Sequence, residues 1–248
     1  MYIKDRIHAG DGVLRGVLSL IPSPVAAQAI AAAGADFVLI DREHGPIDRE
    51  TVHAMIAATA GTSCAPLVRV PGVDEAEVVA ALDAGAEGIV FPMIRTAEDA
   101  ERCVSHMTYP PGGTRGWGPF VGHSRYGTSA AGYTEEVADR LTCGVLIETV
   151  EAVENIDAIL AVPGLDVAVV ARYDLSTALG VHGHFDAPAF TDAVATVERA
   201  AAAAGMPIGG IALTAADSAS LAAKGYRLLV NAVDVLMLEG GVAGFRGW

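Results

Sequence analysis

The sequence predicts a single domain, residues 1–248, with the (β/α)8 barrel fold. Its 248 residues match the usual length of one such barrel. Short apolar runs alternate with longer Ala-rich amphipathic runs from end to end, which is the pattern of a parallel sheet covered by helices. Eight apolar runs favour closure into a barrel over an open sheet. The first of them also lacks the glycine fingerprint that a dinucleotide-binding sheet needs.

The apolar runs are expected to be strands because each is short and rich in branched aliphatic residues. They cover residues 16–20, 37–41, 66–70, 88–93, 144–148, 167–171, 208–213 and 228–234. Helical periodicity is found between them at 24–33, 49–60, 74–84, 97–107, 152–160, 189–204 and 215–224. Many of these helices end at a glycine, the usual helix stop. The tail after Asp234 is short for a closing eighth helix.

One connection is unusually long. Residues 109–127 are rich in Gly, Pro and aromatics, and a long ordered loop inside a barrel is more often functional than idle. Its Trp117 and Phe120 are expected to line a pocket mouth or to close a subunit interface. His182 and His184 fall in a predicted solvent-exposed loop, and Gly209 and Gly210 are expected to serve packing within a strand.

Composition excludes several classes of partner. The formal net charge is −14, with no Lys/Arg-rich run, so nucleic acid and anionic membranes are not expected to bind. The first ten residues are too polar for a signal peptide, and the apolar stretches are interrupted by Gly, Asp or Pro. A cytoplasmic protein is expected. Cys64, Cys103 and Cys143 are scattered and are expected to be buried and unpaired.

Two carboxylates follow neighbouring predicted strands. In a barrel the active site lies at the carboxyl ends of the strands. Glu148 ends the fifth strand and Asp174 follows the sixth, which places both within reach of one cation. Oxygen ligands with open positions suit Mg²⁺ or Mn²⁺. The alternative is that both residues are helix N-caps, and the spacing leaves both interpretations open.

A second group of charges ends the second and third strands. Asp41 and His44 end the second strand, and a carboxylate that fixes an imidazole tautomer makes the ring a usable base near neutral pH. Arg69 ends the third strand, where it can stabilise a developing enolate oxygen. The structural alternatives are a histidine held by a turn carboxylate and an ordinary ion pair from Arg69 to Asp41 or Glu43.

The two lysines allow an exclusion. A Schiff-base mechanism needs a desolvated lysine on an inner strand. Lys4 precedes the first strand, and Lys224 lies where a helix returns to the last strand. Carbonyl chemistry in this barrel would therefore need a metal as its electron sink.

Several ordered blocks resemble one family over nearly the full length. The sequence is similar to the HpcH/HpaI family of class II 2-oxo acid aldolases, whose fold is a (β/α)8 barrel of the phosphoenolpyruvate/pyruvate type. The matching blocks are LIDREHGPID (39–48), PLVRVPG (66–72), LDAGAEGIVFPM (82–93), YPPGGTRG (109–116), LIETVEAVENIDAILAVPGLD (146–166) and DLSTALG (174–180). Their order and spacing together carry the resemblance.

The resemblance implies roles for individual residues. It implies Glu148 and Asp174 as ligands of a divalent metal, Mg²⁺ or Mn²⁺ with Co²⁺ as a further candidate. It implies His44, oriented by Asp41, as acid/base and Arg69 beside the pyruvyl oxygens. It also implies that Asp83 serves the active site of a neighbouring subunit in a hexamer built as a trimer of dimers. The implied reaction cleaves or forms a C–C bond of a 4-hydroxy-2-oxo acid through a metal-bound pyruvate enolate and an aldehyde.

Two departures from the family pattern bear on the substrate. Leu146 stands where the family usually has Gln, two residues before the metal-binding Glu. Arg172 and Tyr173 precede Asp174, where the family usually has a Gly-Pro-small sequence. These three residues are expected to contact substrate, with Arg172 and Tyr173 adding a cation and a phenol beside the metal.

Two other functions compete with the aldolase. One is Claisen-type ligation or its reverse on the same scaffold, such as citrate formation from oxaloacetate and acetyl-CoA, and turnover with acetyl-CoA would separate the two. The other is a non-catalytic binding protein that kept the barrel. The presence of Asp41, His44, Arg69, Glu148 and Asp174 argues against it.

Overall fold

The computed structural model of the chain contains a closed barrel of eight parallel strands, in which each strand pairs with the next and β8 pairs with β1. The structure describes residues 1–10 and 12–246. The strands are β1 (Leu14–Ser19), β2 (Phe37–Asp41), β3 (Ala65–Arg69), β4 (Gly88–Phe91), β5 (Thr142–Ile147), β6 (Val167–Val170), β7 (Ile208–Ile211) and β8 (Leu228–Val233). The barrel and all eight predicted strands are therefore confirmed, with ends that differ by at most two residues.

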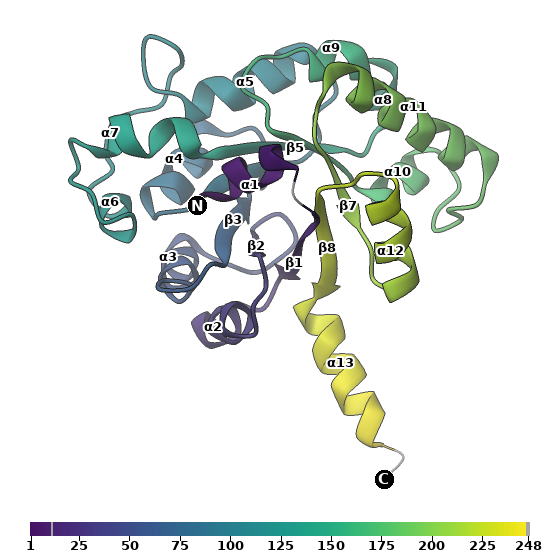
Figure 1. Ribbon diagram of the computed structural model, residues 1–248, viewed down its shortest axis with the longest axis horizontal. Helices are drawn as coiled ribbons and strands as arrows, with labels where there is room; N and C mark the ends of the chain where they lie inside the picture. Colours follow the sequence, from purple (N-terminus) through teal and green to yellow (C-terminus); the bar gives the residue numbers. More distant parts are fainter. Residues whose placement is uncertain (11, 247–248) are drawn as a thin grey trace.

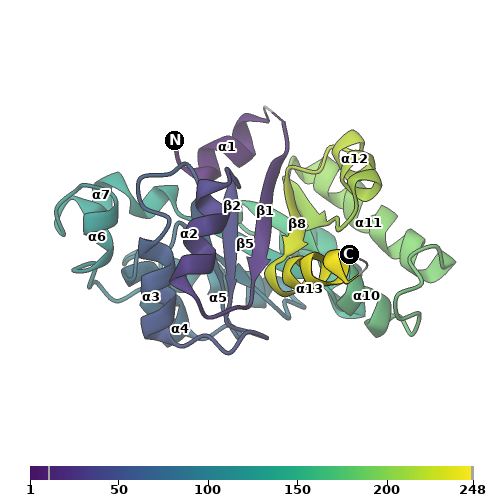
Figure 2. The same ribbon diagram turned by 90° about the horizontal axis from the view of Figure 1, so that it is seen from below.

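Helices surround the barrel as an outer layer (Figures 1 and 2). They are α2 (Pro24–Ala32), α3 (Arg49–Ala57), α4 (Glu75–Asp83), α5 (Ala97–Met107), α8 (Val150–Glu154), α9 (Ile156–Leu160), α11 (Pro188–Ala204) and α12 (Ala215–Ala223). A further short helix, α10 (Arg172–Ala178), follows β6. The helix predicted at 152–160 is in fact two, because Asn155 leaves helical geometry between α8 and α9.

Strand alternation divides the apolar residues into two cores. Side chains of β5 that point outward, such as Val145 and Ile147, join the core between barrel and helices. Leu146 points inward and packs with residues of the other strands inside the barrel. Because Glu148 is the next inward position after Leu146, its carboxylate stands above the apolar interior at the carboxyl end.

The amino end of the barrel is closed by the first helix. Helix α1 (Ile3–Ala9) buries Ile3 and Ile7 in the interior core. Lys4 forms an ion pair of 3.1 Å with the buried Asp166, whose other carboxylate oxygen accepts from the Cys143 amide at 2.8 Å. These contacts hold α1 over the end of the barrel that is remote from the candidate site.

The long connection between α5 and β5 also lies at the amino end, because it leaves a helix and enters a strand. It contains α6 (Gly122–Arg125), α7 (Tyr133–Glu136) and the 3-10 turn η1 (Ala138–Arg140). Arg115 fixes this segment from inside: its guanidinium is fully buried, lies 4.6 Å from the Tyr109 ring centre and donates to Asp83 Oδ1 at 2.8 Å.

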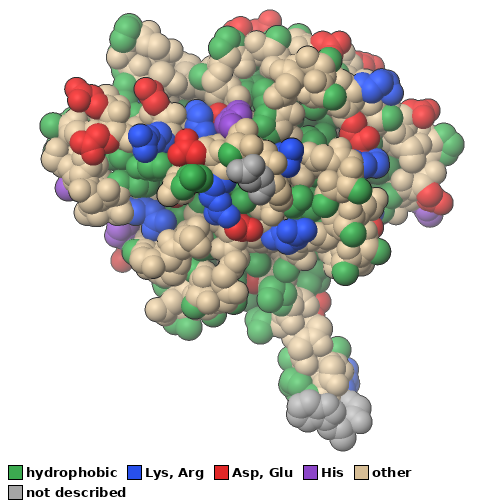
Figure 3. Space-filling model, in the orientation of Figure 1, with side chains coloured by type: hydrophobic (Ala, Val, Ile, Leu, Met, Phe, Trp, Pro, Cys, Tyr) green, Lys and Arg blue, Asp and Glu red, His purple; other side chains and the backbone are tan. Residues whose placement is uncertain are grey.

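The C-terminal tail forms a helix that leaves the barrel. Helix α13 (Asp234–Phe245) projects away from the strands, as Figures 1 and 2 show. Only its first residue, Asp234, is buried, and it accepts hydrogen bonds from Ser19 Oγ and the Leu20 amide. Figure 3 shows apolar side chains along the projecting part. The tail is thus helical, and it does not pack against its own barrel as a closing eighth helix.

No helix in the described part of the chain is both long enough and apolar enough to cross a bilayer.

Candidate active site

Glu148 is the buried centre of the candidate site. It follows β5, only 4% of its surface is exposed, and one carboxylate oxygen accepts from the Met93 amide at 2.5 Å. Burial is the main cause that raises the pKa of Glu148 to about 7, and the neighbouring charges of Asp174 and Glu43 act in the same direction. The Met93 hydrogen bond and Arg69 oppose this rise. A cation bound beside this buried carboxylate would stabilise its ionised form.

Asp174 and Glu43 are the carboxylates that face Glu148. Asp174 lies in the first turn of α10, just beyond β6. Burial raises the pKa of Glu43, with Arg69 and His44 opposing the rise and Asp41 and Asp174 adding to it. The alternative that Asp174 is an N-cap is not what the structure shows, since Ala171 occupies that position and makes no side-chain cap.

Arg69 and Asp41 form a buried ion pair across β2 and β3. The two residues are register partners, so their side chains rise side by side from adjacent strands. Arg69 donates from Nε to Asp41 Oδ1 at 2.9 Å and from Nη2 to Oδ2 at 2.6 Å. Its Nη1 lies 3.1 Å from Glu43 Oε2. The guanidinium is therefore held rigidly by two carboxylates at the edge of the site.

The expected pairing of Asp41 with the His44 ring needs correction. Among the described residues, the Asp41 carboxylate binds Arg69 and accepts from the backbone amides of Glu43 and His44. The His44 side chain is 61% exposed, and its Nε2 lies 3.9 Å from Glu43 Oε2. Asp41 thus orients the turn that carries His44, while Glu43 is the carboxylate nearest to the imidazole.

Leu146 lies beneath the carboxylates, as its strand parity requires. It is 4% exposed and belongs to the interior core together with its register partner Val169 on β6. The floor of the site is therefore apolar at the position where the family pattern has an amide side chain.

Arg172 and Tyr173 do not point toward the carboxylates. Ala171 faces the barrel interior, so Arg172 takes the outward direction. Its guanidinium carbon lies 3.6 Å from the centre of the Phe185 ring, and Nη1 lies 3.4 Å from Asp217 Oδ2. Tyr173 packs edge-on against the same Phe185 ring at 5.2 Å. The expectation that they add a cation and a phenol beside the metal is wrong for this structure.

Asp83 lies far from the carboxylates of its own chain. It is the last residue of α4, which runs antiparallel to the strands and so ends at the amino end of the barrel. There its carboxylate binds the buried Arg115. Within one chain Asp83 has a structural role, and any part in catalysis would be in the site of another copy.

The donor set fits a hard divalent cation. Within the described residues, no three His, Cys, Asp or Glu side chains form a complete metal cage. Glu148 and Asp174 offer only oxygen, and their mutual repulsion is recorded in the raised pKa of Glu148. Two carboxylates with remaining positions open to water and substrate suit Mg²⁺ or Mn²⁺ better than Zn²⁺.

Lys4 and Lys224 pair with Asp166 and Glu198 outside the barrel interior, so neither can form a Schiff base within it. The three cysteines are buried and free, as predicted. His182 and His184 lie in an exposed loop, also as predicted. Gly209 serves packing, because a Cβ there would lie 2.8 Å from the Leu228 carbonyl oxygen.

Two site residues were missed in the sequence analysis. Glu43 was considered only as an ion-pair partner of Arg69. Its position between Asp41 and His44 was the available signal for a third carboxylate. Met93 has a positive φ of 58°, an uncommon conformation for a residue with a side chain, and this conformation lets its amide point at Glu148. No local sequence signal marks such a position.

Comparisons with known proteins extend over nearly the whole chain. The model of the HpcH/HpaI aldolase/citrate lyase family matches residues 17–239. The 2-dehydro-3,6-dideoxy-6-sulfogluconate aldolase of Pseudomonas putida is 36% identical over 90% of this chain and 87% of its own. The hydroxypyruvate/pyruvate aldolase of Roseovarius nubinhibens is 32% identical over 95% of this chain and 91% of its own. The crystal structure of a citrate synthase superposes with a TM-score of 0.87 at 30% identity, covering 98% of this chain and 95% of that one.

Proposed function

The chain belongs to the HpcH/HpaI aldolase/citrate lyase family, and on that premise we propose that it is a divalent-metal-dependent aldolase, a carbon–carbon lyase. Its proposed substrate is a 4-hydroxy-2-oxo acid, which it cleaves to pyruvate or a close relative and an aldehyde, or forms in reverse. The observation that carries this proposal is the buried Glu148, which faces Asp174 and Arg69 at the carboxyl end of the barrel.

We assign metal binding to Glu148 and Asp174. A divalent ion there, Mg²⁺ or Mn²⁺ with Co²⁺ as a further candidate, would polarise the 2-oxo carbonyl and stabilise negative charge on its oxygen. Arg69, held by Asp41 and Glu43, contributes a fixed positive charge for the carboxylate and carbonyl oxygens of the substrate. Leu146 would lie under the small apolar end of the substrate.

Proton transfer is assigned to His44. In cleavage the imidazole takes the proton of the 4-hydroxyl, directly or through water, and Glu43 stabilises the imidazolium that results. The C3–C4 bond breaks, its electron pair passes into the enolate of the 2-oxo acid, and the aldehyde leaves. Protonation at C3 then gives pyruvate. Asp41 acts on His44 through the backbone of their shared turn.

A homo-oligomer is also proposed, as a hexamer built from a trimer of dimers. The exposed apolar side chains Leu236, Met237, Leu238 and Val242 of α13 support self-association, since apolar surface of this kind is usually covered by another chain. Asp83 would then serve a neighbouring site. The net charge of −14 supports a cytoplasmic protein that binds neither nucleic acid nor membrane.

The deciding experiment follows the exchange of pyruvate C3 protons with deuterium by NMR. With Mn²⁺ or Mg²⁺ present, wild-type protein is expected to catalyse exchange, and chelation is expected to abolish it. Glu148→Gln should be inactive, while Glu151→Gln, an exposed acid on α8, should behave as wild type. Exchange that persists in EDTA would contradict the metal assignment.

Citrate-synthase-like chemistry is the second candidate, favoured by the superposition on a citrate synthase. Formation of citrate from oxaloacetate and acetyl-CoA, together with failure to exchange pyruvate protons, would replace the aldolase proposal. Oxaloacetate decarboxylation does not discriminate, because both reactions would produce it through the same enolate.

A further inference from the structure

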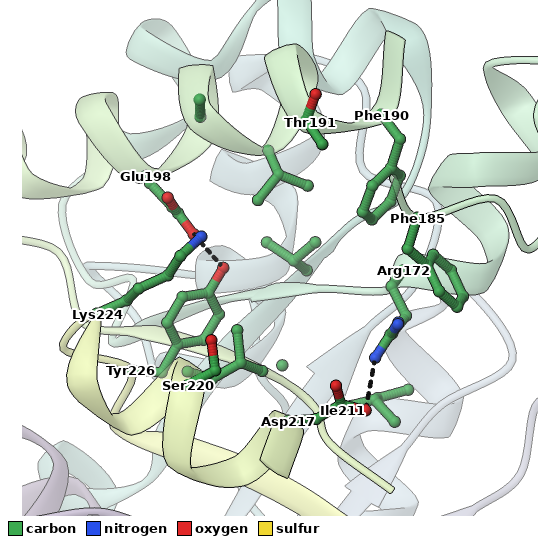
Figure 4. A pocket seen from close by; sticks show the side chains of 15 residues that line it. Arg172, Phe185, Phe190, Thr191, Glu198, Ile211, Asp217, Ser220, Lys224 and Tyr226 are labelled. Atoms are coloured by element: carbon green, nitrogen blue, oxygen red, sulfur yellow. Dashed lines mark hydrogen bonds and ion pairs between the residues drawn. The ribbon is translucent and has the colours of Figure 1, made fainter. Parts of the chain in front are cut away.

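A cavity lies outside the barrel, between α11 and α12 (Figure 4). It has a volume of about 230 Å³, and its floor is the outer face of β6 and β7. Gly210 lies on that outer face and is closely covered by side chains that also line the cavity. A Cβ on Gly210 would approach the Tyr226 ring to 3.1 Å and the Leu221 side chain to 3.6 Å.

The walls of this cavity are apolar and partly aromatic. Phe190 and Val194 come from the α11 side, Leu221 from α12, and Val170 from β6. Phe185 stands at one end beside Phe190, with ring centres 5.3 Å apart. Glu148, Asp174, Arg69 and His44 do not line the cavity, so it is distinct from the candidate active site.

Both ends of the cavity carry charges that are already paired. At one end, Arg172 lies over Phe185 and contacts Asp217. At the other end, Glu198 Oε1 accepts from Lys224 Nζ at 2.9 Å and from the Tyr226 hydroxyl at 3.0 Å. Figure 4 shows these two pairs on opposite sides of the apolar walls. The formal charge of the four ionised side chains sums to zero.

We propose that this cavity is a binding site for a neutral aromatic molecule that carries a hydroxyl group. Its volume exceeds the roughly 150 Å³ of an apolar cavity known to take up benzene, so one substituted ring fits. An anion would have to approach Asp217 and Glu198, and a cation would have to approach Arg172 and Lys224. A neutral ring avoids the electrostatic repulsion that an anion or a cation would meet there. Its hydroxyl can donate to a carboxylate at either end.

The probe for this site is 4-methylphenol, which is neutral near pH 7 because phenols have a pKa of about 10. It is titrated into the full-length wild-type protein with labelled Ile, Leu and Val methyl groups. Methyl signals of Leu221 and Val194 are expected to shift, with NOEs from the probe ring. Benzoate and benzylamine, of similar size but opposite charge, are expected to bind at least about tenfold more weakly.

Two variants place the binding event in the cavity. Ala195→Trp, on the cavity side of α11, should fill it and weaken 4-methylphenol at least about tenfold. Ala203→Trp, an exposed position on the same helix and outside the cavity, should bind as wild type. The methyl spectrum shows whether each variant is folded. If Ala195→Trp does not fold, the NOEs in the wild-type protein decide whether the probe binds in the cavity.

The inference is overturned by any of three results. These are the absence of probe NOEs to the Leu221 and Val194 methyls, equal or tighter binding of benzoate or benzylamine, and unchanged binding to a folded Ala195→Trp protein. The binding test does not measure pyruvate exchange, so the result of the binding test is independent of the proposed aldolase activity.

Discussion

Glu148, a ligand in the proposed metal site, is a single buried carboxylate that would link metal binding to pH. Its pKa of about 7 in the metal-free site arises mainly from burial, and the charges of Asp174 and Glu43 act in the same direction. A metal ligand must be deprotonated, so protons and metal compete for the same oxygen atoms. The residues around Glu148 thus place the pH below which protons compete with the metal near neutrality. For an ordinary glutamate this pH would be much lower.

We predict that metal affinity falls as the pH drops below about 7. Binding should release close to one proton per site at pH 6, and the apparent Kd should rise up to about tenfold for each further pH unit. Calorimetric titration with Mn²⁺ in buffers of different ionisation enthalpy measures both quantities. An apparent Kd that is constant from pH 5.5 to 8 would contradict the assigned ligand.

The same raised pKa predicts a stability effect in metal-free protein. Because the folded pKa is above the unfolded value of 4.5, the contribution of Glu148 to stability is fully present below pH 4.5 and is lost as the pH rises through about 7. Glu148→Gln removes this loss, so at pH 8 it should raise the free energy of unfolding by about 1–3 kcal/mol. Denaturant titrations in EDTA at pH 5 and pH 8 test this, and a gain of equal size at both pH values would contradict it.

His44 is predicted to affect the rate more than the binding. His44→Ala should slow aldol cleavage by roughly 10²–10³-fold through loss of the proton acceptor. Metal affinity should change little, because the ring is largely exposed and no contact joins it to Glu148 in the described residues. Single-turnover rates and Mn²⁺ titration separate the two effects. His182→Ala, in an exposed loop, is the control, and a rate equal to that of the control would remove His44 from the mechanism.

At the scale of elements, the long connection between α5 and β5 depends on one buried charge. Arg115 is enclosed by the rings of Tyr109 and Tyr133, and its anionic partner among the described residues is Asp83 on α4. A buried guanidinium that loses its counter-charge is costly. Asp83 therefore ties residues 109–140 to the outer helix layer.

We predict that Asp83→Asn lowers the free energy of unfolding by about 1–3 kcal/mol, since it leaves Arg115 with a neutral partner. Residues 109–140 should also exchange their amide hydrogens faster than the barrel strands do. Denaturant titration and hydrogen exchange provide the measurements. Asp139→Asn, an exposed position in the same segment, should match wild type; equal effects of the two variants would refute the structural role.

At the scale of the whole molecule, the exposed apolar surface of α13 supports the proposed homo-oligomer. Among the large apolar side chains of this helix, Leu236, Met237, Leu238 and Val242 are 47–61% exposed, although the helix follows directly from the barrel. A monomer would leave them in water. We therefore propose α13 as a contact element between copies of the chain.

We predict that Leu238→Asp reduces the molar mass of the assembly, because a charge placed in an apolar interface is not compensated there. Light scattering on size-fractionated protein measures the mass. Glu239→Gln, on the same helix, is expected to leave it unchanged. A wild-type protein that is already monomeric would contradict both this prediction and the proposed hexamer.

The barrel, its eight strands and the charged residues at their carboxyl ends were accessible from the sequence, because strand parity and helix periodicity are local properties of the chain. The same parity explains why Glu148 and Leu146 share the barrel interior. The direction of Arg172 was not accessible, since it depends on Phe185 and Asp217, which come from elements outside the barrel. The positive φ of Met93 was likewise not accessible, since it serves a hydrogen bond to Glu148, which lies 55 residues away in the chain. Local patterns specify which residues reach the site, whereas packing decides which charges meet there.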